Sequence, residues 1–202
     1  MERKQSHDNV QNNTDTTEAS TEQEASPATR PHIYVASLSD YNDGRLHGVW
    51  IDPTLEVDEI NDQIERMLRV STDEGAEEFA VHDYVGFESL RLQEYDTIET
   101  IHRLAVGIEQ HGDAFATYAE WVGTDQATTD GFEDCYYGTY QSMRELVEEW
   151  ADSMGWTDEV TRLGDKLGIA PFLKIDYALL EDVFRTEWYV AETSSGVHLF
   201  TS

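Results

Sequence analysis

The feature that most constrains this chain is a large excess of negative charge within the part that can fold. The formal net charge of −29 arises from 42 acidic and 13 basic side chains. Residues 1–31 hold six of the acidic and three of the basic ones, so residues 32–202 keep a net charge of −26. Self-repulsion opposes a compact state, and a domain gains solubility from far less charge than this. We therefore expect a function that selects for the acidity.

Composition and charge together exclude whole classes of protein. Binding nucleic acid by neutralising its phosphates needs a basic footprint, which is missing here. Hydrophobic residues make up 39% of the sequence and aromatic residues 11%, enough to build real cores. No apolar run approaches the ~18 residues of a membrane span, and the N-terminus lacks the apolar core of a signal peptide, so we expect a cytoplasmic protein. The single cysteine, Cys135, excludes an intramolecular disulfide and a multi-thiolate metal site within one chain.

Residues 1–31 differ from the rest of the sequence. They are rich in Thr, Ser, Gln, Asn and Glu, contain no aromatic residue, and have Val10 as their only branched aliphatic residue. Such a segment cannot bury enough surface to offset the entropy lost on ordering. It is predicted to be a disordered tail.

The remaining residues predict an elongated α+β protein of three small domains in a row. Residues 32–91 read as a β-β-α-β module, in which a turn over 41–44 joins the first two strands. The expected strands cover 32–40, 45–51 and 76–87, and the expected helix has its apolar positions at Val57, Ile60, Ile64 and Leu68.

Residues 92–134 predict a small helical domain. Asp96 to Glu99 has capping-box spacing and opens a helix that stops at Gly112. A second helix is expected over 113–122, followed by a polar connection over 124–133.

Residues 135–202 predict a third, α+β domain. A short strand is expected near Cys135, and a capping box at Ser142 heads a helix with Met143, Leu146, Val147, Trp150 and Met154 inward. Val160, Leu163 and Leu167 mark another helix, a last helix begins at Asp176, and a closing hairpin joins 188–192 to 197–200.

Metal and catalytic motifs are weak. Asp40, Asn42 and Asp43 resemble the start of a calcium loop, but Gly44 and Ile51 stand at the wrong positions for one. The sequence shows no nucleophile elbow and no glycine-rich phosphate loop with a lysine. We therefore expect neither catalysis nor a cofactor or metal.

Isolated pairs of polar residues do not require a catalytic or metal-binding role. His82 beside Asp83, and Glu109 near His111, arise easily by chance in a chain with 7 His and 42 acids. We interpret them as surface or strand-edge groups. Cys135, beside two tyrosines, is interpreted as a small buried hydrophobic residue rather than a nucleophile.

Three blocks of sequence resemble the ArdA family of antirestriction proteins. The first and most specific is YVASLSDYNDG over 34–44, followed by LHG over 46–48 and WI over 50–51. EEFAVHDY over 77–84 is similar to the next block of the family, and LLEDVF over 179–184 lies where the family carries its antirestriction motif.

The resemblance implies a protein of mobile genetic elements that mimics bent B-form DNA and blocks type I restriction-modification enzymes. It also implies three small domains in a row, an elongated homodimer, and no enzymatic activity or cofactor. Neither nucleic acid nor membrane is an expected partner. The motif residues, several of them candidate dimer contacts, are Leu179, Leu180, Glu181, Asp182, Val183 and Phe184.

In this interpretation, exposed acids take the place of DNA phosphates. Duplex DNA carries one charge about every 1.7 Å, so 26 charges correspond to roughly 44 Å of duplex. The candidates are Glu56, Asp58, Glu59, Asp62, Glu65, Glu94, Asp96, Glu99, Glu109, Asp113, Glu120, Asp125, Asp130, Glu133, Asp134, Glu145, Glu148, Glu149 and Asp152.

Two alternatives stay open. The chain could be an acidic adaptor that binds a basic regulatory protein without mimicking the shape of DNA, or an enzyme whose site the sequence does not reveal. Competition distinguishes the first from mimicry, because a mimic displaces duplex DNA from its target. A salt-adapted acidic surface would also explain the charge, and the presence of only three lysines agrees with it.

Overall fold

The computed structural model of the chain describes residues 30–73, 75–93 and 96–201. Within them lie eight α-helices, one short 3-10 helix and two antiparallel sheets of three strands each, which confirms the predicted α+β class. The predicted tail lies outside the described residues except for Arg30 and Pro31. None of the described helices is long and apolar enough to cross a membrane.

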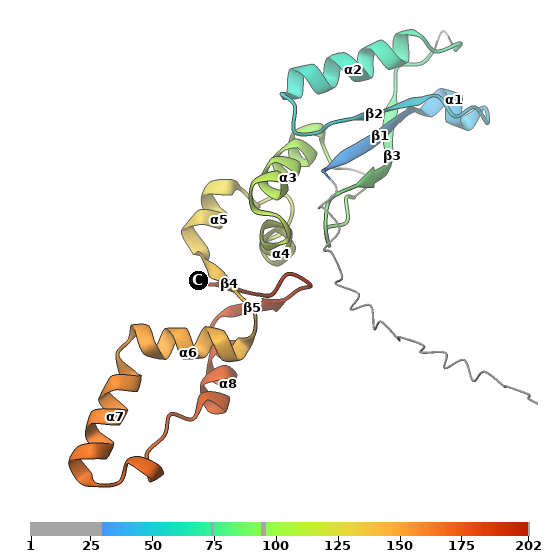
Figure 1. Cartoon of the computed structure of the whole chain (residues 1–202). Coiled ribbons are helices and arrows are strands. Elements are labelled where there is room, and N and C mark those ends of the chain that lie inside the picture. Colours follow the sequence, from blue (N-terminus) through green and yellow to red (C-terminus); the bar gives the residue numbers. More distant parts are fainter. Residues whose placement is uncertain (1–29, 74, 94–95, 202) are drawn as a thin grey trace, which may run out of the picture.

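The first sheet and its helix follow the predicted β-β-α-β order. Their bounds are β1 (His32–Ser37), α1 (Leu38–Asn42), β2 (Gly48–Ile51), α2 (Val57–Arg69) and β3 (Phe79–Val85). The strand order is β2-β1-β3, with antiparallel pairing throughout. Because side chains alternate along a strand, Ile33 and Val35 of β1 point to one face, and they share a core with Ile60 and Ile64 of α2. Figure 1 shows α2 running along one side of this sheet.

The predicted strand over 32–40 is too long, because a short helix begins at Leu38. The Ser37 hydroxyl caps α1 by accepting a hydrogen bond from the backbone N–H of Asp40 at 3.4 Å. The returning strand likewise begins at Gly48 instead of Arg45, since the Arg45 guanidinium turns back to Asp40. Both corrections come from polar contacts that apolar periodicity does not register.

Two helices, α3 (Ile98–His111) and α4 (Asp113–Val122), pack against each other and meet at Gly112. This glycine has φ of 60° and ends α3 as predicted. The helix begins one residue later than the capping-box spacing indicates. The Thr97 hydroxyl, not the Asp96 carboxylate, accepts the hydrogen bond from Thr100 N–H.

The connection over 124–133 contains a helix, α5 (Thr129–Cys135), that the sequence analysis missed. The Thr128 hydroxyl caps it by accepting from Gly131 N–H at 3.1 Å. Phe132 is fully buried and anchors the helix among aromatic side chains. One buried residue in a polar segment gives no apolar period, so the sequence alone does not predict this helix.

The second sheet has the order β4-β6-β5. The elements of this part are β4 (Tyr136–Tyr140), α6 (Met143–Ser153), α7 (Trp156–Leu167), η1 (Ala170–Phe172), α8 (Tyr177–Glu187), β5 (Tyr189–Glu192) and β6 (Val197–Phe200). Ser142 and Asp176 cap α6 and α8 as predicted, and β5 and β6 form the predicted hairpin. Met154 was predicted to point inward but is 55% exposed, because α6 ends at Ser153.

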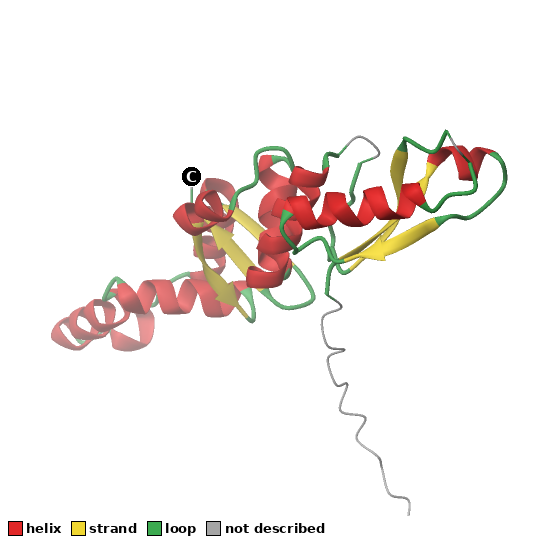
Figure 2. Cartoon of the chain, turned by 90° about the horizontal axis from the view of Figure 1, so that it is seen from above, coloured by secondary structure: helices red, strands yellow, loops and turns green. Residues whose placement is uncertain are grey.

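Two hydrophobic cores share one strand. The first core joins the β1–β3 module to α3, α4 and α5 and includes Phe200 of β6. The second packs α6 and α8 against Val197 and Leu199 of the same strand. Figures 1 and 2 show α3 and α4 between the two sheets.

Candidate functional site

The candidate site is a surface, and it begins on α2. Residues three and four apart lie on the same side of a helix, so burial of Ile60 and Ile64 against the first sheet leaves the opposite side to solvent. The acids of this helix and of its N-cap position are all exposed: Glu56, Asp58, Glu59, Asp62 and Glu65. Glu65 alone among them has an ion-pair partner in the described part of the chain, Arg69 at 3.8 Å.

A second group of acids lies on α3, α4, α5 and the loop before α5. The exposed members are Glu99, Glu109, Glu120, Asp125, Asp130, Glu133 and Asp134. The ion pairs found among the described residues involve none of them. Asp96 is half-buried, and Glu94 lies outside the described residues.

The acids of α6 fall into two kinds. Glu145 is half-buried and accepts a hydrogen bond from Gln141 N–H at 2.5 Å, and Glu148 pairs with Arg144 at the same distance. Glu149 and Asp152 are exposed. The Asp152 carboxylate accepts a hydrogen bond from the Thr157 hydroxyl of α7. Of these four acids, Glu149 alone has neither a hydrogen-bond nor an ion-pair partner among the described residues.

Asp113 belongs to an internal network rather than to the open surface. Its Oδ2 accepts a hydrogen bond from the Ser195 hydroxyl at 2.6 Å and lies 3.5 Å from Nε2 of the buried His198. Burial acts to raise the pKa of Asp113, but hydrogen bonds from Ser195 and Thr193 and the nearby imidazole outweigh it, so the pKa is lowered. This carboxylate ties α4 to the β5–β6 hairpin.

The same three residues do not form a hydrolytic triad. In a triad the carboxylate and the nucleophile bind opposite nitrogens of the imidazole. Here Ser195 and Asp113 both approach Nε2 of His198, and the Thr139 hydroxyl occupies the Nδ1 side at 2.9 Å. Asp113 therefore cannot orient His198 from the opposite nitrogen as a general base for Ser195.

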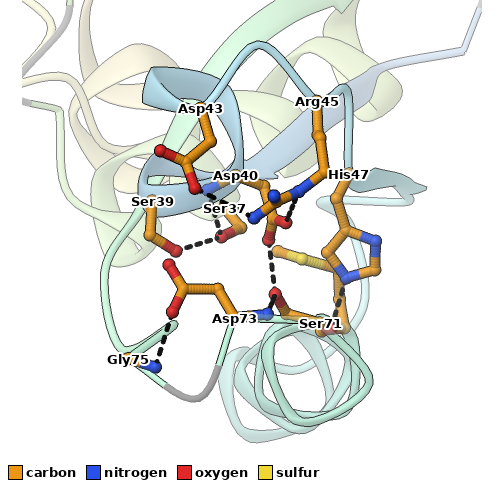
Figure 3. Close-up of polar contacts among 10 residues, drawn as sticks. Ser37, Ser39, Asp40, Asp43, Arg45, His47, Ser71, Asp73 and Gly75 are labelled. Atoms are coloured by element: carbon orange, nitrogen blue, oxygen red, sulfur yellow. Dashed lines mark hydrogen bonds and ion pairs between the residues drawn. The ribbon is translucent and has the colours of Figure 1, made fainter.

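Asp40 lies at the centre of a polar cluster that the sequence analysis did not identify (Figure 3). Its Oδ1 accepts from Arg45 Nε at 2.9 Å, and its Oδ2 accepts from the Ser71 hydroxyl at 2.5 Å. The hydrogen bond from Ser71 is the main cause that lowers the pKa of Asp40 to about 2, and burial opposes it. These bonds engage both oxygens of the carboxylate and hold the 38–47 segment against the C-terminal end of α2.

The other polar pairs occupy structural positions. His82 packs edge-on against Tyr41 at 4.4 Å, and His111 lies against Phe132 at 4.5 Å. Cys135 is half-buried, and burial raises the pKa of its thiol. Within residues 30–73, 75–93 and 96–201, no three His, Cys, Asp or Glu side chains converge as a metal site would require. The acids are therefore dispersed over the surface.

The LLEDVF segment forms the middle of α8 and divides between core and surface. Phe184 is 1% exposed and packs against Trp150 and Trp188 in the second core. Leu179 is 62% exposed and Val183 is 37% exposed. Leu180 and Glu181 are half-buried, whereas Asp182 is exposed. Of the apolar residues in this segment, Leu179 and Val183 offer the most surface to a second molecule.

One family model matches this chain. It is the model of ArdA, described as antirestriction protein, and it covers residues 33–197. The match spans all three sequence blocks quoted above and nearly all of the described elements. No curated protein matches the chain.

Proposed function

This chain belongs to the ArdA family of antirestriction proteins, and on that premise we propose that it occupies the DNA-binding groove of a type I restriction-modification enzyme as a mimic of duplex DNA. Members of the family are inhibitors, not enzymes, and their target is a restriction enzyme. What we add for this chain is the manner of inhibition. We place it in the cytoplasm, where such an enzyme meets DNA.

The observation that carries the proposal is the dispersion of exposed acids. They lie on α2, on α3 to α5 and on α6, and most have no ion-pair partner among the described residues. A groove that holds DNA carries a positive field, which attracts an anionic surface and speeds its association. A dispersed charge fits such an extended groove better than it fits one small binding site.

Some of the candidate acids already have partners within the chain. Glu65, Glu148 and Asp113 are engaged by Arg69, Arg144 and the Ser195–His198 network. We propose that the exposed acids without such partners carry most of the interaction. They are Glu56, Asp58, Glu59, Asp62, Glu99, Glu109, Glu120, Asp125, Asp130, Glu133, Asp134 and Glu149.

We further propose that the active form is an elongated homodimer of three-domain chains. Two copies double the length of DNA that the charge can imitate, to roughly 90 Å at one charge per 1.7 Å. The exposure of Leu179 and Val183 supports a contact through α8. Solution scattering tests this directly, since a compact particle of one chain's mass would contradict it.

A charge-neutralisation series tests the mimicry. Glu59, Asp62, Glu109 and Glu149 are converted to Gln or Asn, singly and together, and each variant competes with duplex DNA for a type I enzyme at two salt concentrations. Each single change should weaken competition by less than about tenfold, because the interaction is shared. The dependence on salt should decline as changes accumulate, because fewer charges remain to be screened.

Glu159→Gln serves as the matched control. Glu159 forms an ion pair with Arg162, so its replacement changes the net charge equally but removes an acid that is already paired. It should cost less than Glu59→Gln. If one substitution abolished binding and the others had no effect, or if the chain bound the enzyme without displacing DNA, an acidic adaptor would replace the mimic.

A further inference from the structure

The first sheet has one face that no helix covers in the described part of the chain. On β1, Ile33 and Val35 face α2 and are fully buried. Tyr34 lies between them and therefore points to the other face. That face of β1 to β3 carries aromatic side chains at positions where a solvent-facing strand usually has polar ones.

Three side chains form a row across this uncovered face. Tyr34 pairs with Trp50 of β2 on one side and with Asp83 of β3 on the other, and directly paired residues lie on the same face. The rings of Tyr34 and Trp50 lie 5.4 Å apart and are tilted by 52°. Trp50 is 45% exposed, and Asp83 is also exposed. We call Trp50, Tyr34 and Asp83 the aromatic row.

The backbone beside the row is shaped to hold the Tyr34 ring in place. A Cβ at Gly48 would lie 2.7 Å from Cζ of Tyr34 and 2.5 Å from the carbonyl oxygen of Val35, so only glycine leaves room for this ring. Tyr41 of α1 packs edge-on against His82, in the middle of β3, and is 54% exposed. The exposed rings are thus part of an ordered surface.

We propose that the aromatic row binds arginine side chains of the protein that this chain inhibits, an inference that rests on the proposed function. A guanidinium stacks on aromatic faces and pairs with carboxylates, which a lysine ammonium does far less well. The row offers an indole, a phenol ring and a carboxylate side by side. Phosphate-binding grooves supply the arginines, and the net charge of −26 on residues 32–202 repels nucleic acid itself.

A stacking contact depends on the planar shape of the cation as well as on its charge. Acids alone attract arginine and lysine by similar Coulomb interactions. A cation over an aromatic ring at an exposed site gains roughly 0.5–1 kcal/mol. Where the weakly hydrated guanidinium stacks and the strongly hydrated ammonium does not, this gain corresponds to about a two- to fivefold preference for arginine at 1.4 kcal/mol per tenfold.

The test uses the full chain with deca-arginine and deca-lysine peptides as probes. The indole N–H resonance of Trp50 is identified by its loss in Trp50→Phe, and peptide titrations are followed by NMR. Deca-arginine should shift this resonance at about two- to fivefold lower concentration than deca-lysine. Trp156, which is 43% exposed on α7, is the internal control and should show no such preference.

Variants separate stacking from charge. In the two Trp50 variants, which lack the indole resonance, the backbone amide resonance of Tyr34 is followed instead. Trp50→Ala should remove the preference for deca-arginine, and Trp50→Phe should keep most of it. Asp83→Asn, followed at the Trp50 indole, should reduce it. Equal responses of Trp50 to both peptides would overturn the proposal. So would a shift of the Trp50 resonance on removal of residues 1–29, because the chain's own N-terminal segment would then occupy the row.

The peptides also separate this inference from the proposed function. If the Trp50 preference is present but the chain does not displace DNA from a type I enzyme, the proposed function fails and the arginine site stands. If the chain displaces DNA and Trp50→Ala competes as well as Trp50→Phe, the aromatic row is not part of the contact.

Discussion

Replacing Phe184 or Leu179 of α8 by alanine should separate the stability of the single chain from its dimerisation. Phe184 is 1% exposed and its ring lies 4.0 Å from Trp188 and 5.3 Å from Trp150. Replacing a buried Phe by Ala removes transfer free energy and leaves a cavity, at a cost of about 3–5 kcal/mol. Leu179 is 62% exposed, and exposed substitutions usually change stability by less than about 0.5 kcal/mol.

The two substitutions should therefore behave in opposite ways. For a chain of this size, about 2–4 °C per kcal/mol predicts that Phe184→Ala lowers the melting temperature by roughly 6–20 °C. Leu179→Ala should leave the melting temperature almost unchanged and should shift the equilibrium from dimer to monomer. Thermal unfolding at a concentration where each variant is monomeric gives the first quantity, and sedimentation equilibrium at higher concentration gives the second.

Two results would refute this reasoning. If Phe184→Ala kept the melting temperature of the parent, Phe184 could not be the centre of the second core. If Leu179→Ala and Val183→Ala both left self-association unchanged, the exposed side of α8 would not be the dimer contact, whatever the stability of the chain.

Asp40→Asn should flatten the dependence of stability on pH in acid. The pKa of Asp40 is about 2 in the folded chain against an ordinary 3.8. Its contribution to the free energy of unfolding is therefore complete above pH 3.8 and is lost as the pH falls toward 2. Urea unfolding across this range measures the free energy, and parallel pH curves for the variant and the parent would contradict the prediction. Gly107→Ala should destabilise the chain, because the new methyl group overlaps the buried ring of Phe115. Overpacking costs about 1–3 kcal/mol and the helix preference for Ala returns roughly 1 kcal/mol; thermal unfolding should also show partial recovery when Phe115→Leu is added. A chain that begins at Arg30 should inhibit as well as the full chain, and loss of inhibition at unchanged stability would make the first 29 residues a recognition element.

Elements with local signals were predictable from the sequence. Ser142 and Asp176 cap their helices through hydrogen bonds to residues three positions later. Gly112 and Gly168 end theirs with positive φ. These contacts lie within one helical turn, so the order of residues along the chain already specifies them.

Elements that depend on distant partners were not predictable in the same way. Asp40 looks like a loop acid until Ser71, 31 residues later, donates to its carboxylate. The helix at Thr129–Cys135 depends on the packing of Phe132 against the rings of Tyr118 and Tyr136. Both tyrosines lie outside the polar segment, so its own sequence does not indicate this packing.

The candidate acids show the same division. The period of α2 correctly places Glu59 and Asp62 on its exposed side. Asp113 also looks like a surface acid, but its partner Ser195 lies 82 residues away. The pairing of Glu148 with Arg144 was readable from their spacing of four residues, a signal that the counting of acids alone ignores.

The sharing of β6 between two cores limits how the chain can tolerate insertions and deletions. Adding or removing one residue in the turn before Val197 would exchange the two faces of the strand. Val197 and Leu199 would leave the core of α6 and α8, and Phe200 would leave the core of α4 and α5, in a single step. Surface loops usually accept changes of length. The short turn between β5 and β6 should not, because the two faces of β6 pack in two different cores.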